Sequence, residues 1–239
     1  MCTPMSSPQN QQVSEPGSVP EASAPDLILA SQSPARASIL SASGLHFRTI
    51  VSGVDEDAAV ERAEKEQGAP LSPAQTALTL ARAKAEAVAA LPASQGCLVL
   101  GCDSVFELNG EAFGKPYEPE VAVSRIRDMS GTTGTLHTGH WLIDVRDSVN
   151  GSNGPTGLGE VRSADVTFDD MSDEEIRDYV ATGEPLEVAG SFTIEGFGAA
   201  FITGIRGESH TVLGLSINAL KHLLRERGLE IAQLWTRNT

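Results

Sequence analysis

The sequence has few cysteines and no long apolar run. Its three cysteines, Cys2, Cys97 and Cys102, are odd in number and unevenly spaced, which argues against a disulfide framework or a cysteine-based metal motif. This usage is typical of a reducing compartment, so we expect a cytoplasmic protein. No stretch approaches the roughly 20 apolar residues of a membrane-spanning helix, and the first 25 residues lack the basic start and apolar core of a signal peptide. We therefore expect no membrane partner.

Positive charge is also scarce. The chain has 17 Lys and Arg against 32 Asp and Glu, which gives a formal net charge of −15. A surface this acidic disfavours DNA, RNA and anionic lipid, so we expect no nucleic-acid partner. A small anionic substrate remains compatible with the composition if a metal ion and local cations offset the charge.

The low aromatic share and 23 glycines favour an α/β protein with many turns over a helical bundle. Residues 1–25 are rich in Ser, Pro and Gln and are predicted to be a disordered N-terminal tail. We predict one domain over residues 26–228 and a C-terminal extension over 229–239. A chain of 239 residues is long enough for one domain with a sizeable core.

Apolar runs and helix-capping signals alternate along this domain. Strands are predicted near 27–30, 47–51, 97–108, 136–145, 160–168 and 198–205. Helices are predicted over about 33–44, 72–91, 118–129, 172–183 and 217–227. The dipeptide Asn109-Gly110 predicts a tight hairpin, and residues 150–159 read as a second, flexible hairpin tip. Alternating elements with hairpin returns predict an α/β fold with a mixed central β-sheet flanked by helices.

The segment SQSPAR (31–36) joins the first predicted strand to the first predicted helix. Such a turn directs backbone N–H groups and the positive end of the helix dipole toward one point, where phosphates commonly bind. Ser31 and Ser33 can donate hydroxyl hydrogen bonds there, and Arg36 adds a permanently charged fork. The alternative is a capped helix with an exposed arginine.

Asp103 ends an otherwise apolar strand, where a carboxylate is costly to bury without a partner. It could hold a metal ion or orient an attacking water, or it could cap a turn. Lys115, between Gly114 and Pro116, suits a phosphate but could equally be an exposed turn lysine.

Lys84 lies four residues from both Leu80 and Val88, which puts it near the packed stripe of its helix. It could direct a buried ammonium at Asp103 or a phosphate, or its head could reach solvent. Asp55 and Glu56 could be solvated loop acids or further metal-site carboxylates.

A glycine-rich segment at 183–201 could let a ligand approach the backbone closely. Glu195 lies within it, and Phe192 and Phe197 could wall a base; the alternative is a bulged edge strand. His137 and His140 bracket the start of a predicted strand without a third metal ligand nearby, so we interpret them as structural.

Taken in the order in which they occur along the chain, these segments resemble the Maf family of nucleoside triphosphate pyrophosphatases. The matching segments are LILASQSPARASIL (27–40), VSGVDED (51–57), LARAKA (80–85), GCDSVFELNGEAFGKP (101–116), YVATGEPLEVAGSFTIEGFGAAF (179–201) and VLGL (212–215). The resemblance covers about residues 26–226 and implies a Maf/ITPase-like fold. It also implies water attack on the α-phosphorus of a nucleoside triphosphate, with release of pyrophosphate.

The resemblance assigns roles residue by residue. It makes Asp103 the general base or metal-bound acid, with Glu56 near the metal, which would be Mg²⁺ or alternatively Mn²⁺. It puts the phosphates against a set of polar and basic side chains: Ser31, Ser33, Arg36, Lys84 and Lys115. Homodimerisation is a further expectation from the family.

Three positions that the family links to base choice depart from its patterns. The family's paired arginines are here Ala35-Arg36, and Ser104 stands where a pyrimidine-preferring branch has Thr. Glu195 stands where that branch has Gln and where a 7-methyl-GTP-cleaving branch has Glu. Because Glu only accepts hydrogen bonds, it complements the N1–H and N2–H₂ donors of guanine.

The leading hypothesis is therefore a pyrophosphatase acting on non-standard, modified or excess nucleotides. A nucleotide-binding regulator of cell division or septum formation, with vestigial hydrolysis, is the alternative from another class. A phosphatase that releases orthophosphate is a third.

Overall fold

The computed structural model describes residues 26–146 and 156–236. The predicted tail at 1–25, with Cys2, and most of the predicted hairpin tip at 150–159 lie outside these residues. The described strands are β1 (Leu27–Ala30), β2 (Phe47–Thr49), β3 (Leu98–Leu108), β4 (Glu111–Phe113), β5 (Thr133–Asp144), β6 (Gly157–Phe168) and β7 (Ile202–Arg206).

The described α-helices are α1 (Pro34–Ala42), α2 (Glu56–Gln67), α3 (Pro73–Ala89), α4 (Pro119–Met129), α5 (Asp173–Ala181), α6 (Ser209–Leu213) and α7 (Ile217–Arg225). Short 3-10 helices are η1 (Pro92–Ser94), η3 (Glu184–Glu187), η4 (Ala189–Ser191), η5 (Phe197–Phe201) and η6 (Ile231–Leu234). No helix in the described part of the chain is long and apolar enough to cross a membrane.

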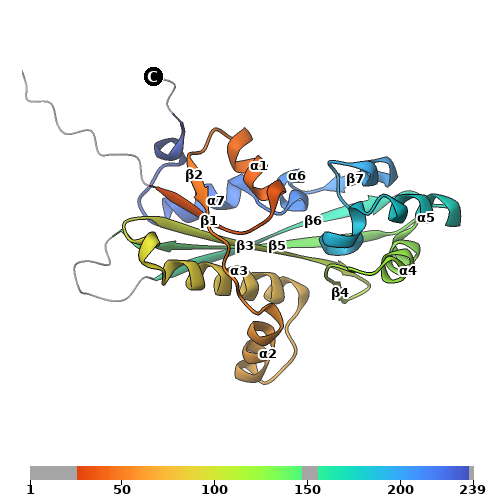
Figure 1. Cartoon of the computed structure of the whole chain (residues 1–239), viewed down its shortest axis with the longest axis horizontal. Coiled ribbons are helices and arrows are strands. Elements are labelled where there is room, and N and C mark those ends of the chain that lie inside the picture. Colours follow the sequence, from red (N-terminus) through yellow and green to blue (C-terminus); the bar gives the residue numbers. More distant parts are fainter. Residues whose placement is uncertain (1–25, 147–155, 237–239) are drawn as a thin grey trace, which may run out of the picture.

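One mixed sheet runs through the length of the molecule (Figure 1). Its order is β2-β1-β3-β5-β6-β7, with β4 paired to β3 beside this path. The pairs β1–β2 and β1–β3 are parallel, whereas the pairs β3–β4, β3–β5, β5–β6 and β6–β7 are antiparallel. Helices cover both faces, so the predicted mixed sheet flanked by helices is confirmed.

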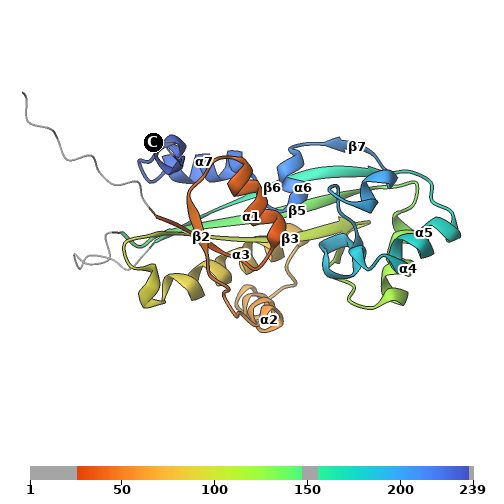
Figure 2. The ribbon, with the colours of Figure 1, turned by 45° about the horizontal axis from the view of Figure 1, so that its top comes forward.

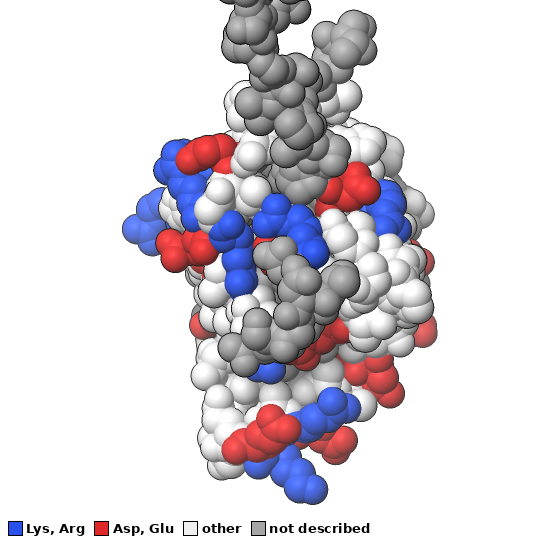
Figure 3. Space-filling view, turned by 90° about the vertical axis from the view of Figure 1, so that its left-hand side faces the viewer, with Lys and Arg blue, Asp and Glu red and all other residues white. Residues whose placement is uncertain are grey.

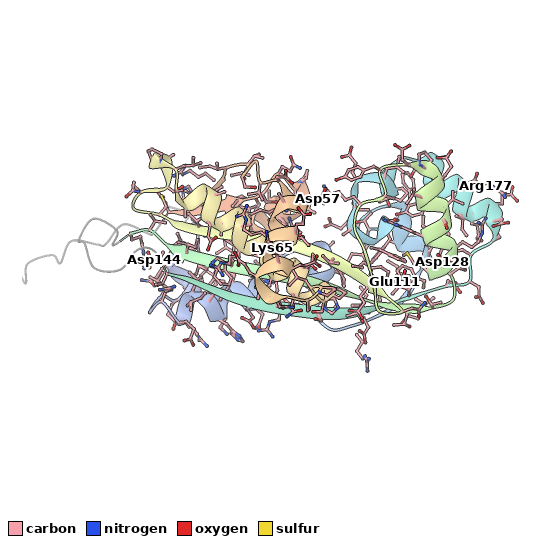
Figure 4. All side chains as sticks on the ribbon, turned by 90° about the horizontal axis from the view of Figure 1, so that it is seen from below. Asp57, Lys65, Glu111, Asp128, Asp144 and Arg177 are labelled. Carbon is pink, nitrogen blue, oxygen red and sulfur yellow. The ribbon has the colours of Figure 1, made fainter. Side chains whose placement is uncertain are left out.

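Three groups of helices surround the sheet. Helices α1, α6 and α7 lie on one face and α3 lies on the other, while α4 and α5 gather at one end (Figures 1 and 2). In the view from below, α2, marked by Asp57 and Lys65, and β4, marked by Glu111, lie at separate places along the sheet (Figure 4). Asp144 and Arg177 mark opposite ends of the molecule in that view.

Helix α3 touches the sheet backbone at two glycines. A Cβ on Gly101 would lie 2.1 Å from the carbonyl oxygen of Ala81, and one on Gly139 would lie 2.4 Å from that of Ala77. Small residues on both sides therefore permit this close approach. As a result, Lys84 on α3 comes within reach of Asp103 on β3.

The alternation of side chains along β3 builds two apolar clusters on one face. Leu100 and Cys102 join the cluster that packs against α1 and α7, and Phe106 and Leu108 join a second cluster toward α4 and α5. The segment predicted to be a C-terminal extension contributes Leu234, which is buried in the first cluster.

Some predicted elements differ from the structure. The acidic connection near Asp55 continues into α2, with Asp55 as its N-cap. The predicted strand at 198–205 begins only at Ile202, because residues 197–201 form η5. His137 and His140 lie inside β5 and do not bracket its start. The short helix α6 was not predicted from the sequence.

Candidate active site

A short stretch of β3 has an open edge in the middle of the sheet. On that edge β1 pairs with Leu98–Gly101, and β4 pairs with Phe106–Leu108. Residues 102–105, between them, have no strand partner on this edge within the described residues. The chain leaves β1 beside this gap and enters α1, so the phosphate-binding turn predicted from the sequence lies next to Asp103 and Ser104.

The Arg36 guanidinium is held by three oxygen atoms, two of which come from distant segments of the chain. Its Nε donates to the Gly214 carbonyl oxygen at 2.7 Å, its Nη1 to Ser31 Oγ at 3.2 Å and its Nη2 to Ser104 Oγ at 3.1 Å. Since a guanidinium has five N–H donors, two remain available for an anionic ligand.

The turn before α1 adds a further hydrogen-bond donor. Ser33 caps the helix by accepting a hydrogen bond from the Arg36 backbone N–H, with Pro34 at the first helical position. Ser31 Oγ accepts from the Ser33 N–H at 3.1 Å as well as from Arg36. Both lone pairs of Ser31 are therefore used, and its hydroxyl hydrogen has no acceptor within the described residues. Ser31 is ready to donate to a ligand oxygen.

Lys84 bridges two carboxylates beside this turn. Its Nζ lies 2.5 Å from Asp103 Oδ1 and 2.7 Å from Glu56 Oε1. The Lys84 and Asp103 side chains are 12% and 11% exposed, whereas that of Glu56 is 53% exposed. The ammonium thus joins a buried acid to one at the rim, and Asp103 Oδ2 keeps no bonding partner among the described residues.

Burial is the largest single influence on the pKa of each member of this pair, but it decides the direction of the shift only for Asp103. It raises the pKa of the Asp103 carboxyl above its usual value, although the Lys84 ammonium and the Arg36 guanidinium act in the opposite direction. For Lys84, burial acts to lower the pKa, but Asp103 and Glu56 together outweigh it and raise the pKa. The lysine therefore stays charged next to a carboxyl of increased basicity.

The donor set fits a metal shared with a substrate better than a preformed metal cage. Among the described residues, no group of three or more His, Cys, Asp and Glu side chains could hold a metal ion. Mg²⁺, however, needs only one or two carboxylates when waters and phosphate oxygens complete its shell. Asp103 Oδ2 and the second oxygen of Glu56 are the atoms that fit this need.

Three other predicted site residues have no bond to this centre within the described residues. Ala35 lies in the first turn of α1 and is half-buried, next to Arg36. Lys115 is exposed directly after β4, and Glu195 is exposed between η4 and η5. Neither of these two side chains has a bonded partner within the described residues.

The proposed aromatic walls separate into two environments. Phe197 is 66% exposed, but Phe192 is buried and packs edge-to-face against Phe106 and Phe168. The suggestion that Phe192 walls a base is therefore wrong, because that ring belongs to the apolar core. His137 bonds to Ser163 and Glu107, and His140 accepts a hydrogen bond from the Ser216 N–H, so both have structural contacts.

Two contributors to the site were missed by sequence reasoning. Gly214, which holds Arg36, adopts φ 102°, and a Cβ there would lie 3.2 Å from Arg36 Nε. Thr138 is fully buried and bonds to Ser104 Oγ at 2.9 Å. The VLGL segment could have pointed to Gly214. The presence of a polar residue on an apolar face of a strand could have pointed to Thr138.

Comparisons with known proteins identify the family. The family model described as Maf-like protein matches residues 26–227. A nucleoside triphosphate pyrophosphatase of Streptomyces avermitilis is 48% identical over 210 residues, covering 88% of this chain and 94% of the relative. One from Leifsonia xyli subsp. xyli is 46% identical over 213 residues, covering 88% and 97%.

Among solved structures, a HAM1 protein from Coxiella burnetii matches with a TM-score of 0.39 and 14% identity. The match covers 84% of this chain and 99% of that one. The family model spans most of the sequence, and the two relatives match over nearly their whole length. The chain belongs to the Maf family.

Proposed function

We propose that this protein is a hydrolase that cleaves nucleoside triphosphates to the monophosphate and pyrophosphate. The observation that carries the proposal is the convergence of the Arg36 turn and the Lys84–Asp103 pair at the open edge of β3. The names of the relatives agree with it, since two of them are nucleoside triphosphate pyrophosphatases.

In this mechanism Asp103 acts on the attacking water. Oδ1 is bonded to Lys84, so one lone pair of Oδ2 orients the water and takes its proton, and the other lone pair would remain for the metal. Burial supports this role because it raises the pKa of the carboxyl and makes it a stronger base. Lys84 fixes the carboxylate and supplies a positive charge beside it.

The phosphates bind to the turn before α1. The Ser31 hydroxyl donates to one phosphate oxygen, and the two remaining Arg36 N–H groups donate to others. Ser33 adds its hydroxyl hydrogen, since its oxygen accepts from the Arg36 N–H, and the start of α1 adds the helix dipole. Lys115 is exposed on the chain after β4 and supplies a further cation to the triphosphate.

A divalent metal, Mg²⁺ or Mn²⁺, completes the proposed site. Asp103 and Glu56 would hold it together with the substrate, and when bound it would neutralise charge on the phosphate oxygens. The acidic net charge of the chain makes such neutralisation necessary, since the substrate is itself an anion.

For the base, we propose non-standard or modified purines of the guanine type as preferred substrates. Glu195 is exposed and unpaired within the described residues, so its acceptor-only carboxylate is free to meet the N1–H and N2–H₂ groups of guanine. Ala35 leaves space where a longer side chain would stand next to Arg36. Ser104 contributes to the same site through its bond to Arg36.

A substrate panel tests the function. The purified chain is incubated with Mg²⁺ and each of a set of standard and modified nucleoside triphosphates, and pyrophosphate and orthophosphate are assayed separately. Pyrophosphate with a stoichiometric amount of monophosphate is expected. Orthophosphate alone would indicate a phosphatase, and binding without any product would favour a regulator with vestigial hydrolysis.

A further inference from the structure

A polar pair interrupts the apolar face of the sheet behind Arg36. Ser104 lies between Cys102 and Phe106 on one face of β3, and each of these two belongs to a different apolar cluster. Ser104 is paired across the sheet with Thr138 of β5, which is 0% exposed. A fully buried hydroxyl is costly unless its hydrogen bonds are satisfied, so the bonds of Thr138 define its role.

In this pair, the donor and the acceptor of each hydrogen bond can be assigned from the partners. Thr138 Oγ1 lies 2.8 Å from the Thr211 carbonyl oxygen, which can only accept, so the single Thr138 hydroxyl hydrogen points there. In the 2.9 Å contact between Ser104 Oγ and Thr138 Oγ1, Ser104 must therefore donate. Its hydroxyl hydrogen is then used, and its oxygen accepts from Arg36 Nη2.

We propose that Thr138 is a positioning residue that fixes Ser104 as a hydrogen-bond acceptor for Arg36. Ser104 then has no hydrogen to donate to a nucleotide, and its main contribution is to hold the guanidinium. This proposal rests on the proposed function, in which Arg36 binds the phosphates.

The surroundings of Arg36 support this assignment. The Gly214 carbonyl oxygen holds Nε, and a Cβ on Gly214 would lie 3.3 Å from Ser104 Oγ. Thr211 and Gly214 belong to α6 and its C-cap, so the chain of bonds ties β3 and β5 to the same helix that anchors the guanidinium. The arrangement fixes the plane of the Arg36 fork before substrate arrives.

The effect of substitutions at Ser104 on different nucleotides distinguishes positioning of Arg36 from direct recognition of the base by Ser104. If Ser104 acts through Arg36, its removal weakens contacts with the phosphates, which every nucleoside triphosphate carries. If Ser104 instead donates to a base, its removal selectively affects the nucleotides that present an acceptor there. Substitutions at position 104 should therefore lower the turnover of all bases by the same factor.

A double-mutant cycle tests the proposal. The variants are Ser104→Ala, Thr138→Val, the double variant and the conservative Thr138→Ser, each measured by kcat/KM for every nucleotide that the wild type cleaves. Thr133→Val is the matched control, because within the described residues the Thr133 hydroxyl bonds only to that of Thr167, across β5 and β6. Thermal melting establishes which variants fold.

A hydrogen bond to a charged group predicts losses in kcat/KM of about tenfold for Ser104→Ala and about fivefold for Thr138→Val. The double variant should lose about tenfold and not fiftyfold, because both substitutions break one chain of bonds. Thr138→Ser and Thr133→Val should stay within about twofold of the wild type.

Two results would overturn the proposal: a loss confined to one base, or losses that multiply in the double variant. If Thr138→Val fails to fold, the base dependence of Ser104→Ala and the retained activity of Thr138→Ser still decide it. If the wild type releases no pyrophosphate, the proposed function fails, and the same cycle on the Kd of an α,β-imido nucleotide decides the positioning role separately.

Discussion

The role of Lys84 shows how far a single residue can be interpreted from sequence. Its position near the apolar stripe of an Ala-rich helix left open whether its ammonium was buried or reached solvent. The structure answers this, since the lysine lies between Asp103 and Glu56 and is mostly buried. Helical spacing gave the correct face of α3, but the partners lie on other elements and could not be derived from spacing.

The contacts of Arg36 show the corresponding limit. A strand followed by a capped helix correctly predicted that Ser31, Ser33 and Arg36 would lie together. Gly214, however, is 178 residues away from Arg36 along the chain. The direction of the bond between Ser104 and Thr138 also depends on a carbonyl of α6, so it required coordinates.

Replacing Asp103 by Asn tests the proposed base. The amide cannot take a proton from water, so we expect kcat to fall by about 10²–10⁴-fold. Nucleotide affinity should remain within about tenfold, because the phosphate contacts are made by other residues. Pyrophosphate release and calorimetric binding of an α,β-imido analogue measure the two effects.

Asp165→Asn is the control for this substitution, because Asp165 is a strand aspartate that pairs with Arg206 outside the site. The Asp165 variant should retain turnover within about twofold of the wild type, whereas the Asp103 variant should lose base catalysis. Near-normal turnover in the Asp103 variant would refute its catalytic role.

His140 predicts a pH dependence of stability. Burial lowers its pKa from 6.5 to about 4, with the charges of Arg36 and Arg162 adding to the effect and hydrogen bonds to backbone carbonyls opposing it. Between these two values the unfolded chain binds more protons than the folded one. The free energy of unfolding therefore falls as the pH drops from 6.5 toward 4, by up to about 3 kcal/mol in total.

His140→Gln isolates this contribution. A glutamine can still accept the hydrogen bond from the Ser216 N–H but does not titrate. Urea unfolding between about pH 7 and pH 5 should give a dependence on pH that is flatter than that of the wild type, by up to about 1.4 kcal/mol per pH unit. Parallel curves for the two proteins would show that the folded state does not depress this pKa.

At the scale of elements, the strength of the apolar signal decided what was predicted. Strands β1 and β3 are buried on both faces and were predicted close to their observed bounds. Helix α2 has no buried residue, so its sequence lacks the apolar stripe from which a helix is predicted. The short helices at 184–201 lack any repeating pattern, because glycines set their conformation.

The contact between α3 and β3 predicts the outcome of adding one methyl group. In Gly101→Ala the new Cβ would overlap the Ala81 carbonyl oxygen, so α3 must move away from the sheet. We expect the free energy of unfolding to fall by about 1–3 kcal/mol. Turnover should fall as well, because Lys84 moves away from Asp103 with its helix. Chemical unfolding and pyrophosphate assays measure both effects.

Gly204→Ala provides the control within another strand. The nearest atom to a Cβ on Gly204 is the Cβ of Thr167 at 4.0 Å, so β7 has room for the methyl group. Its stability should change by less than about 1 kcal/mol, and its turnover should not change. Equal destabilisation by the two substitutions would show that the contact with α3 is not the cause.

For the whole molecule, the central question is how an acidic protein accepts an anionic substrate. At the end of the molecule shown in Figure 3, Lys and Arg side chains stand beside Asp and Glu side chains. Arg146, for example, is bonded to Asp144 at 2.6 Å. The composition predicted the net charge of −15, but only the fold shows that Arg36 and Lys84 meet at one edge of β3.

This charge balance predicts that the metal ion binds together with the substrate and not to the protein alone. Chelation by EDTA should lower pyrophosphate release by at least about 100-fold, and excess Mg²⁺ should restore it. Without nucleotide, Mg²⁺ should shift Tm by less than about 1 °C, since Asp103 and Glu56 alone make a weak site. With the α,β-imido nucleotide present, Mg²⁺ should raise Tm by several degrees, and Asp103→Asn should reduce that shift. A large Tm shift by Mg²⁺ alone would instead indicate a preformed metal site, and the acidic pair would then bind metal independently of substrate.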